Sequence, residues 1–385
     1  MSRDAVHRGV LMELGLLPAL GGSIAELRRS GQDSRLIDGY LQPYSRAFAH
    51  VWYFSYLPES LTDYTDDGRL LASVELVAPR RPVPRFVRAL ALPLVHRGAF
   101  RRCAVLRAFQ ITGVIPALVA RALWGVPFVT TYGFWYARLS HPGLSSGVKR
   151  LLERIGLRFA TAVIVPTEEL RARVATLTPA SRVHLLPNGV DTSRFTPGAR
   201  WIAPVRQILY VGRLETEKNL PTLVTAAAKL AGRFPLRLTF VGDGSLRADL
   251  RAQAEALGVA VEFPGVVDHR RLPARYWEAD AFVLPSFTEG HPKVLLEAMA
   301  SGLPCVASDC PGNRALVQDG ETGLLFDPHS AEALAAALER VLGEESLASA
   351  LGRRAREMIV REYDLGSLVA REIQLLKQVA AAERR

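Results

Sequence analysis

Cysteine is scarce in this sequence of 385 residues, because only Cys103, Cys305 and Cys310 are present and they are widely spaced. A disulfide framework or a zinc site needs paired ligands at short spacing. The sequence therefore excludes both classes and fits a reducing cytosol.

Long apolar runs are also lacking. The longest uncharged stretch in the most basic region, residues 122–137, has 16 residues and contains two glycines and a proline. A membrane-spanning helix needs about 20 apolar residues. The first nine residues mix acidic and basic side chains, and Glu13 interrupts the apolar run that follows. We therefore expect neither a secretory signal nor a segment that crosses a membrane.

Acidic residues are absent from 76 to 152, although the whole chain carries a net charge of +10. Twelve cations lie in this stretch: Arg80, Arg81, Arg85, Arg88, Arg97, Arg101, Arg102, Arg107, Arg121, Arg138, Lys149 and Arg150. Cations interleaved with apolar residues suit an anionic membrane surface, and a solvated basic helix is the alternative. Nucleic acid is a third option, but the sequence has no recognisable nucleic-acid-binding motif. We expect a cytoplasmic protein held peripherally at the inner face of the cell membrane through residues 80–150.

Short apolar runs rich in β-branched and aromatic residues alternate with helical segments in both halves, which predicts an α/β fold with parallel sheets. Strands are predicted at residues 10–14, 50–56, 105–111, 128–131, 162–165, 208–211, 238–241, 261–263, 281–284 and 305–307. Turn formers fill residues 186–198 and predict a linker. The predicted parts are an N-terminal domain 1–187, a linker 188–200, a C-terminal domain 201–363 and a final helix 364–385. The two domains are expected to be Rossmann-like and to face each other across a cleft.

The sharpest functional signal lies in residues 284–302. A predicted strand ends there, a loop holds Glu289, and Pro292 begins a helix where a missing N–H is tolerated. Ligands of open α/β sheets bind outside the carboxyl ends of strands, and helix N-termini offer N–H groups to anions. We predict that the backbone of 290–293 binds a diphosphate and that Glu289 and Glu297 accept hydrogen bonds from hydroxyls.

Three other predicted strand ends support this site. Arg213 and Lys218 follow one strand with charges that suit a diphosphate. Gly242 lets the backbone approach a ligand after the next strand. Val266 and Val267 follow a third strand, whose end offers peptide groups to a nucleobase. Each feature alone also fits a solvated turn, so the interpretation depends on their combination.

These residues together resemble the retaining glycosyltransferases of family 4, which have the GT-B fold of two Rossmann-like domains. The resemblance is carried by Glu289-x7-Glu297 within EGHPKVLLEAMASG, and by NGVD at 188–191, VGRL at 211–214, VGDG at 241–244 and DGETGLLF at 319–326, in the family's order. It runs continuously over residues 162–363.

The resemblance implies a role for each matched residue. Arg213 and Lys218 would hold the diphosphate of the donor, Glu297 the ribose hydroxyls and Glu289 the transferred sugar. Val266 and Val267 would meet the base. The loop and helix start that would contact sugar and phosphate comprise Gly290, His291, Pro292, Lys293 and Val294. The final helix would pack back on the N-terminal domain.

The N-terminal half, which is expected to choose the acceptor, resembles the family less. Gly21 and Gly22 match the family's glycine loop near sugar and phosphate, and a flexible loop is the alternative. Tyr132 stands where many members have a His that contacts the donor sugar. Tyrosine donates a hydrogen bond but does not replace imidazole near neutral pH. The catalytic candidates are therefore Glu289, Arg213, Lys218 and Tyr132.

The resemblance implies transfer, with retention, of a hexosyl group from a UDP- or GDP-sugar to an acceptor hydroxyl. Because the acid-free basic region suits an anionic membrane, we expect this acceptor to be a lipid-linked or cell-envelope glycan. No N-terminal carboxylate stands out as a covalent nucleophile, which favours same-face substitution with the leaving diphosphate as base. The sequence has no Asp-x-Asp pair, so we expect no metal and no other cofactor. A nucleotide-sugar epimerase of the same fold and a noncatalytic partner subunit are the alternatives.

Overall fold

The computed structural model describes residues 12–133, 144–198 and 205–383. The chain divides into two compact units. The first comprises Met1–Arg28, Arg35–Leu186 and Val369–Arg385, and the second comprises Arg29–Ser34 and Pro187–Leu368. The described part of the predicted linker, residues 188–198, therefore belongs to the second unit.

The first unit contains a seven-stranded parallel sheet in the order β3-β2-β1-β4-β5-β6-β7. Its strands are β1 Glu13–Leu17, β2 His50–Phe54, β3 Val74–Val77, β4 Cys103–Ala108, β5 Phe128–Thr131, β6 Ala162–Val165 and β7 Val183–Leu185. Its helices include α1 Ile24–Arg29, α2 Asp33–Leu36, α3 Gln42–Ala47, α4 Gly68–Ser73, α5 Arg85–Val95, α6 Arg97–Arg102, α7 Ile115–Trp124, α9 Leu144–Phe159 and α10 Glu168–Ala175. In the described ranges, no helix of either unit is both long and apolar enough to span a membrane.

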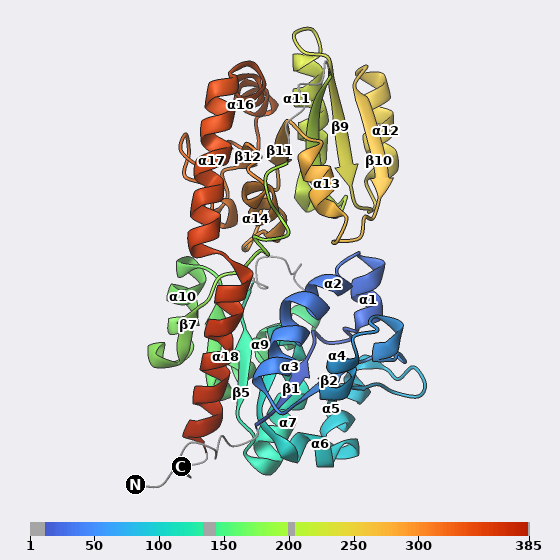
Figure 1. Cartoon of the computed structure of the whole chain (residues 1–385), viewed down its shortest axis with the longest axis vertical. Helices are drawn as coiled ribbons and strands as arrows, with labels where there is room; N and C mark the ends of the chain where they lie inside the picture. Colours follow the sequence, from blue (N-terminus) through green and yellow to red (C-terminus); the bar gives the residue numbers. More distant parts are fainter. Residues whose placement is uncertain (1–11, 134–143, 199–204, 384–385) are drawn as a thin grey trace. The chain divides into compact units, whose positions relative to one another are not determined.

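The second unit contains a six-stranded parallel sheet in the order β10-β9-β8-β11-β12-β13. Its strands are β8 Arg206–Val211, β9 Leu236–Val241, β10 Ala260–Gly265, β11 Ala281–Leu284, β12 Cys305–Ser308 and β13 Leu324–Phe326. Its helices are α11 Leu220–Leu230, α12 Arg247–Ala256, α13 Leu272–Trp277, α14 Lys293–Ala300, α15 Pro311–Arg314, α16 Ala331–Gly343 and α17 Glu345–Glu362. Figure 1 shows α11 and α12 beside β9 and β10.

The strand order places a topological switch point in each sheet. In the second unit, β8 has β9 on one side and β11 on the other, and Leu209 pairs with Phe282 across the β8–β11 junction. Loops that leave the carboxyl ends of β8 and β11 diverge to opposite faces, and ligands of open α/β sheets bind there. The predicted site residues 212–219 and 285–292 are these two loops. The prediction of two parallel-sheet Rossmann-like units is confirmed.

The predicted strands agree best with the structure where a proline adjoins one end of the apolar run. The ranges of β5, β6 and β11 were predicted as they occur. The first strand was predicted at 10–14, whereas β1 begins at Glu13. The Glu13 carboxylate accepts a hydrogen bond from the Trp52 indole. Three short strands, β3, β7 and β13, were missed; each is at or next to an edge of its sheet, where three or four residues leave little pattern.

The last helix, α18 Leu365–Ala382, is attached to the first unit by a buried ion pair. Arg107 on β4 donates to Glu372, and the two side chains are only 4% and 6% exposed. The same carboxylate accepts from Tyr44 at 2.9 Å, and Arg107 also donates to Thr131 at 2.7 Å. Figure 1 shows α18 in red along this unit. Burial of both charges is tolerated because each has several hydrogen-bond partners.

We expect Glu372→Ala to lower the free energy of unfolding by about 3–5 kcal/mol, because it leaves the Arg107 charge buried without its partner. The matched control is Glu383→Ala, which removes the partly exposed pair with Arg121 and is expected to cost less than about 1 kcal/mol. Urea unfolding measures both. Equal losses for the two variants would contradict the assignment.

Candidate functional site

The loop after β8 presents two of the predicted cations. Arg213 is largely exposed and donates to Glu217 at 2.6 Å. Lys218 ends a short 3-10 turn, Thr216–Lys218, and Asn219 follows in the left-handed region with φ 54°. This turn aims the Lys218 side chain toward the loop that follows β11.

Lys218 and Glu289 are brought together at the switch point. The Lys218 Nζ and a carboxylate oxygen of Glu289 are 2.6 Å apart, and the same oxygen accepts from the Ser286 hydroxyl at 2.6 Å. The two side chains are 16% and 11% exposed. Two candidates that lie 71 positions apart in the sequence thus form one charged cluster that solvent still reaches.

Hydrogen bonds link the loop after β8 to the loop after β11. The Phe287 N–H donates to the Glu217 carbonyl at 3.0 Å. The Asn219 side-chain amide donates to the carbonyls of Pro285 and Pro328, at 3.1 and 2.7 Å. A hydrogen-bonded loop of this kind is preorganised, because its polar groups are already fixed before a ligand binds.

The backbone at Gly312, in α15, packs closely against the Glu289 backbone. A Cβ on Gly312 would collide with the Glu289 carbonyl oxygen, so only glycine fits this packing. Asn313 is fully buried and donates to the Ser308 carbonyl at 2.9 Å, which fixes the turn that carries Gly312. The Glu289 backbone is therefore confined by its neighbours.

Helix α14 begins directly after the Glu289 loop. Pro292 was predicted to lie in the first turn of this helix, but it is the N-cap residue, one position earlier. It has no side chain that caps the helix. A helix N-terminus carries positive partial charge and attracts anions. Its position after β11 puts this charge at the same sheet edge as Lys218.

His291 precedes this helix and is buried. Its ring lies 5.6 Å from the Tyr363 ring, centroid to centroid, and its carbonyl accepts from the Asn188 side chain at 2.8 Å. Burial, and secondarily the nearby charge of Lys293, lowers the pKa of His291 to about 3. The imidazole is therefore neutral at physiological pH.

Glu297 lies in the interior of the second unit. One carboxylate oxygen is 3.0 Å from the His269 Nε2 and the other accepts from the Tyr276 hydroxyl at 3.0 Å. The residue is 1% exposed. The predicted contact of Glu297 with ribose hydroxyls stays a prediction.

The ends of β9 and β10 approach the β8 loop closely. Gly242 has φ 132°, and a Cβ there would collide with the Gly212 carbonyl oxygen. The Gly242 N–H donates to the Gly265 carbonyl at 2.8 Å. Val266 is 46% exposed and Val267 is partly buried, so this strand end is accessible as the predicted base contact requires.

In the first unit, Gly21 and Gly22 form the turn between β1 and α1. Gly21 has φ 89°, which favours glycine, and Gly22 N–H donates to the Ala19 carbonyl at 2.7 Å. The first N–H groups of α1 donate to the carboxylate of Glu59, at 3.1 and 2.7 Å. The turn has the predicted form, while its contact with sugar and phosphate stays a prediction.

Tyr132 is fully buried in the first unit. Its hydroxyl donates to Glu153 at 2.7 Å and accepts from Arg173 at 3.3 Å. Burial is the main cause that raises its pKa to about 12. The hydroxyl is therefore neutral, and it is already engaged with two partners. Its catalytic role stays a prediction.

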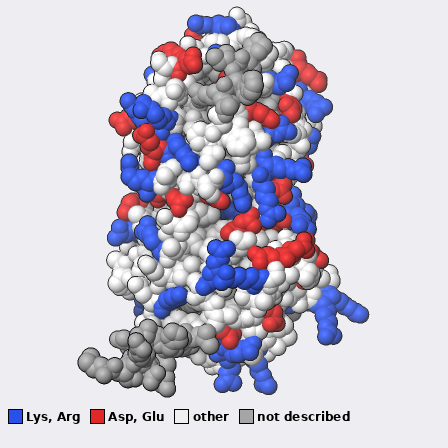
Figure 2. Space-filling view, in the orientation of Figure 1, with Lys and Arg blue, Asp and Glu red and all other residues white. Residues whose placement is uncertain are grey.

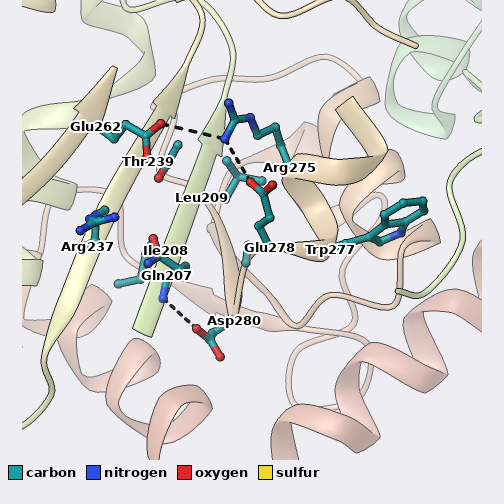
Figure 3. A pocket seen from close by; sticks show the side chains of 11 residues that line it. Gln207, Ile208, Leu209, Arg237, Thr239, Glu262, Arg275, Trp277, Glu278 and Asp280 are labelled. Carbon is teal, nitrogen blue, oxygen red and sulfur yellow. Dashed lines mark hydrogen bonds and ion pairs between the residues drawn. The ribbon is translucent and has the colours of Figure 1, made fainter. Parts of the chain in front are cut away.

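A separate groove of about 380 Å³ lies at the amino ends of the second unit's strands. Figure 3 shows Arg275 between Glu262 and Glu278, and Asp280 accepting from the Gln207 backbone. Its lining includes none of the predicted site residues. These acidic groups already have partners, and the groove is at the opposite end of the strands from the loops described above.

Sequence reasoning missed the side chains that bond to these candidates, namely Glu217, Ser286, His269 and Tyr276. Ser286 and Glu217 lie within four positions of Glu289 and Arg213, so local spacing was a usable signal for them. His269 and Tyr276 come from other segments, and no sequence spacing predicts their contact with Glu297.

Comparison with known proteins defines the class. The family model described as "Glycosyl transferases group 1" matches residues 201–358, and that described as "Glycosyltransferase Family 4" matches residues 40–194. Glycogen synthase of Mycobacterium tuberculosis is 30% identical over 70% of this chain and 67% of that protein. The chain belongs to glycosyltransferase family 4, as its motifs predicted.

A second relative and a solved structure are also similar to the chain. The GDP-mannose-dependent alpha-(1-6)-phosphatidylinositol monomannoside mannosyltransferase of M. tuberculosis is 32% identical over 61% of this chain and 66% of that protein. The structure of Anabaena HepE in complex with UDP and glucose has a TM-score of 0.76 and 17% identity, and covers 95% of this chain and 100% of that one. The latter likeness shows the fold, and the predicted GT-B fold is confirmed.

The buried, neutral His291 predicts how stability depends on pH. Its pKa is lower in the folded chain (about 3) than the ordinary 6.5, so the unfolded chain binds a proton first as the pH falls. The contribution of neutral His291 to the free energy of unfolding is fully present above pH 6.5. It is lost progressively as the pH falls from 6.5 toward 3. Between pH 7 and pH 5 we expect the wild type to lose about 2 kcal/mol more than His291→Gln. Urea unfolding of both, with exposed His329→Gln as control, measures this difference. A His291→Gln variant with the wild-type pH slope would contradict it.

Proposed function

We propose that this chain is a retaining hexosyltransferase that uses a nucleotide diphosphate sugar. The observation that carries the proposal is the Lys218–Glu289 cluster, 2.6 Å apart, beside the N-terminus of α14 at the switch point of the second sheet. A cation, a helix N-terminus and a carboxylate at one sheet edge suit the diphosphate and the sugar of one donor.

Donor binding would exchange partners at this cluster. The diphosphate would take the ammonium of Lys218 and the guanidinium of Arg213, which now pair with Glu289 and Glu217. Glu289 would then accept hydrogen bonds from sugar hydroxyls. Because the loops are already fixed by Asn219 and Phe287, this exchange needs little movement of the backbone.

The proposed reaction replaces one C–O bond by another on the same face of the sugar. The bond between the anomeric carbon and the diphosphate oxygen breaks, and the acceptor oxygen bonds to that carbon. The acceptor's proton passes to the leaving phosphate oxygen. Lys218, Arg213 and the α14 N-terminus would stabilise the negative charge that develops on the leaving group, which is where electrostatic catalysis acts.

The donor and acceptor are proposed from the relatives' names and from the chain's own charge. HepE was solved with UDP and glucose, and the mannosyltransferase is named as GDP-mannose-dependent. We infer a UDP- or GDP-hexose as donor. The same mannosyltransferase is named for a phosphatidylinositol mannoside acceptor. That name and the basic first unit favour an acceptor hydroxyl on a lipid-linked or cell-envelope glycan.

We expect Lys218→Ala and Arg213→Ala each to lower kcat by about 100-fold or more, because each removes a charge that stabilises the leaving diphosphate. The measurement is transfer from UDP- and GDP-hexoses in the presence of a membrane extract. Arg237→Ala, an exposed arginine in the amino-end groove, is the matched control and is expected to retain activity.

If Lys218→Ala turned over the donor at the wild-type rate, the proposed role of Lys218 in stabilising the leaving diphosphate would be wrong. The anomeric configuration of the product, read by proton NMR, tests retention. Conversion of the nucleotide sugar without any acceptor would instead indicate an epimerase, and lack of turnover with every donor would indicate a noncatalytic subunit.

A further inference from the structure

Helix α5 of the first unit has an apolar face that no part of the described chain covers. Five of its apolar side chains are between 45% and 70% exposed: Phe86, Val87, Leu90, Leu94 and Val95. Residues at positions i, i+4 and i+8 share one face of a helix, so Phe86, Leu90 and Leu94 form a continuous stripe. Val83, just before the helix, is also exposed.

The opposite face of α5 is already packed. Ala89, Leu92 and Pro93 are buried, and Arg88 donates from inside the unit to the carbonyls of Ser55 and Val77 at 2.8 and 3.2 Å. The outer face of a surface helix is normally polar. The exposed stripe is therefore not needed to attach α5 to its own unit. Single exposed apolar residues are common on protein surfaces, whereas a contiguous apolar patch marks an interaction site.

Exposed arginines are numerous on the same helix and on the segments next to it in the chain. Six exposed arginines lie on α5, on α6 and on the loop before them: Arg80, Arg81, Arg85, Arg97, Arg101 and Arg102. Of these six arginines, only Arg102 has a carboxylate of the described residues within ion-pair distance, Glu13 at 3.5 Å. The end of the first unit that bears α5 and α6 in Figure 1 is mainly white and blue in Figure 2, with few acidic side chains.

We propose that the α5 stripe and its arginines bind the surface of an anionic lipid bilayer. The apolar side chains would insert among the acyl chains near the headgroups, while the arginines contact lipid phosphates. A neutral protein surface would satisfy the stripe but would leave five arginine charges without counter-charges, so charge complementarity favours an anionic bilayer. This binding surface lies in the first unit and involves none of the donor-site residues.

Flotation of the full-length protein with vesicles tests this proposal. The wild type is expected to float with equimolar phosphatidylcholine and phosphatidylglycerol and to stay down with phosphatidylcholine alone. Leu90→Glu/Leu94→Glu is expected to lower the vesicle affinity by about tenfold or more. Arg80→Gln/Arg81→Gln is expected to lower it by about fivefold for each arginine.

Two matched variants control for general effects. Leu257→Glu changes an exposed leucine and Arg237→Gln an exposed arginine, both in the second unit, and both are expected to float like the wild type. Thermal unfolding with and without UDP shows whether each variant is folded and binds nucleotide. This readout separates failure of membrane binding from failure of the proposed transferase function.

Three outcomes would overturn the proposal. They are wild-type protein that does not float with anionic vesicles, α5 variants that float as well as the wild type, and equal flotation with neutral vesicles. A wild-type dimer in ultracentrifugation that Leu90→Glu/Leu94→Glu converts to a monomer, with no flotation, would assign the stripe to a second copy of the chain instead.

Discussion

The ion pair between Lys218 and Glu289 is the interaction on which the candidate site depends. Both side chains are less than one fifth exposed, so water only partly solvates their charges and each needs a partner. In this structure they are each other's partner. A diphosphate and sugar hydroxyls offer the same two interactions, so the pair holds both charges where a nucleotide sugar would use them.

The same principle extends to the other charged candidates. Arg213 is paired with Glu217, and Glu297 with His269 and Tyr276. These contacts keep the side chains ordered at a cost in binding energy, since a ligand must replace an existing partner. The backbone needs little rearrangement on ligand binding, because Asn219 and Gly312 already fix the loops. The N-terminus of α14 is likewise already formed at this sheet edge.

The sequence predicted the class of fold because short apolar strands with a proline at one boundary give a local signal, as at β5, β6 and β11. It also predicted that Lys218 and Glu289 belong to one site, because both follow strands and carboxyl ends of parallel strands share one edge. It did not predict the burial of Tyr132, which depends on Glu153 and Arg173 from distant helices. It predicted a basic surface interleaved with apolar residues within 80–150, but it did not predict that the exposed apolar side chains lie on α5.

The central claim is that a diphosphate replaces Glu289 as the partner of Lys218. Isothermal titration calorimetry on the full-length protein tests it most directly, by comparing UDP with UMP and GDP with GMP. The account predicts that one diphosphate binds at least about tenfold more tightly than its monophosphate, because the second phosphate supplies the charge that Lys218 and the α14 N-terminus meet. Equal affinities within both pairs would contradict it.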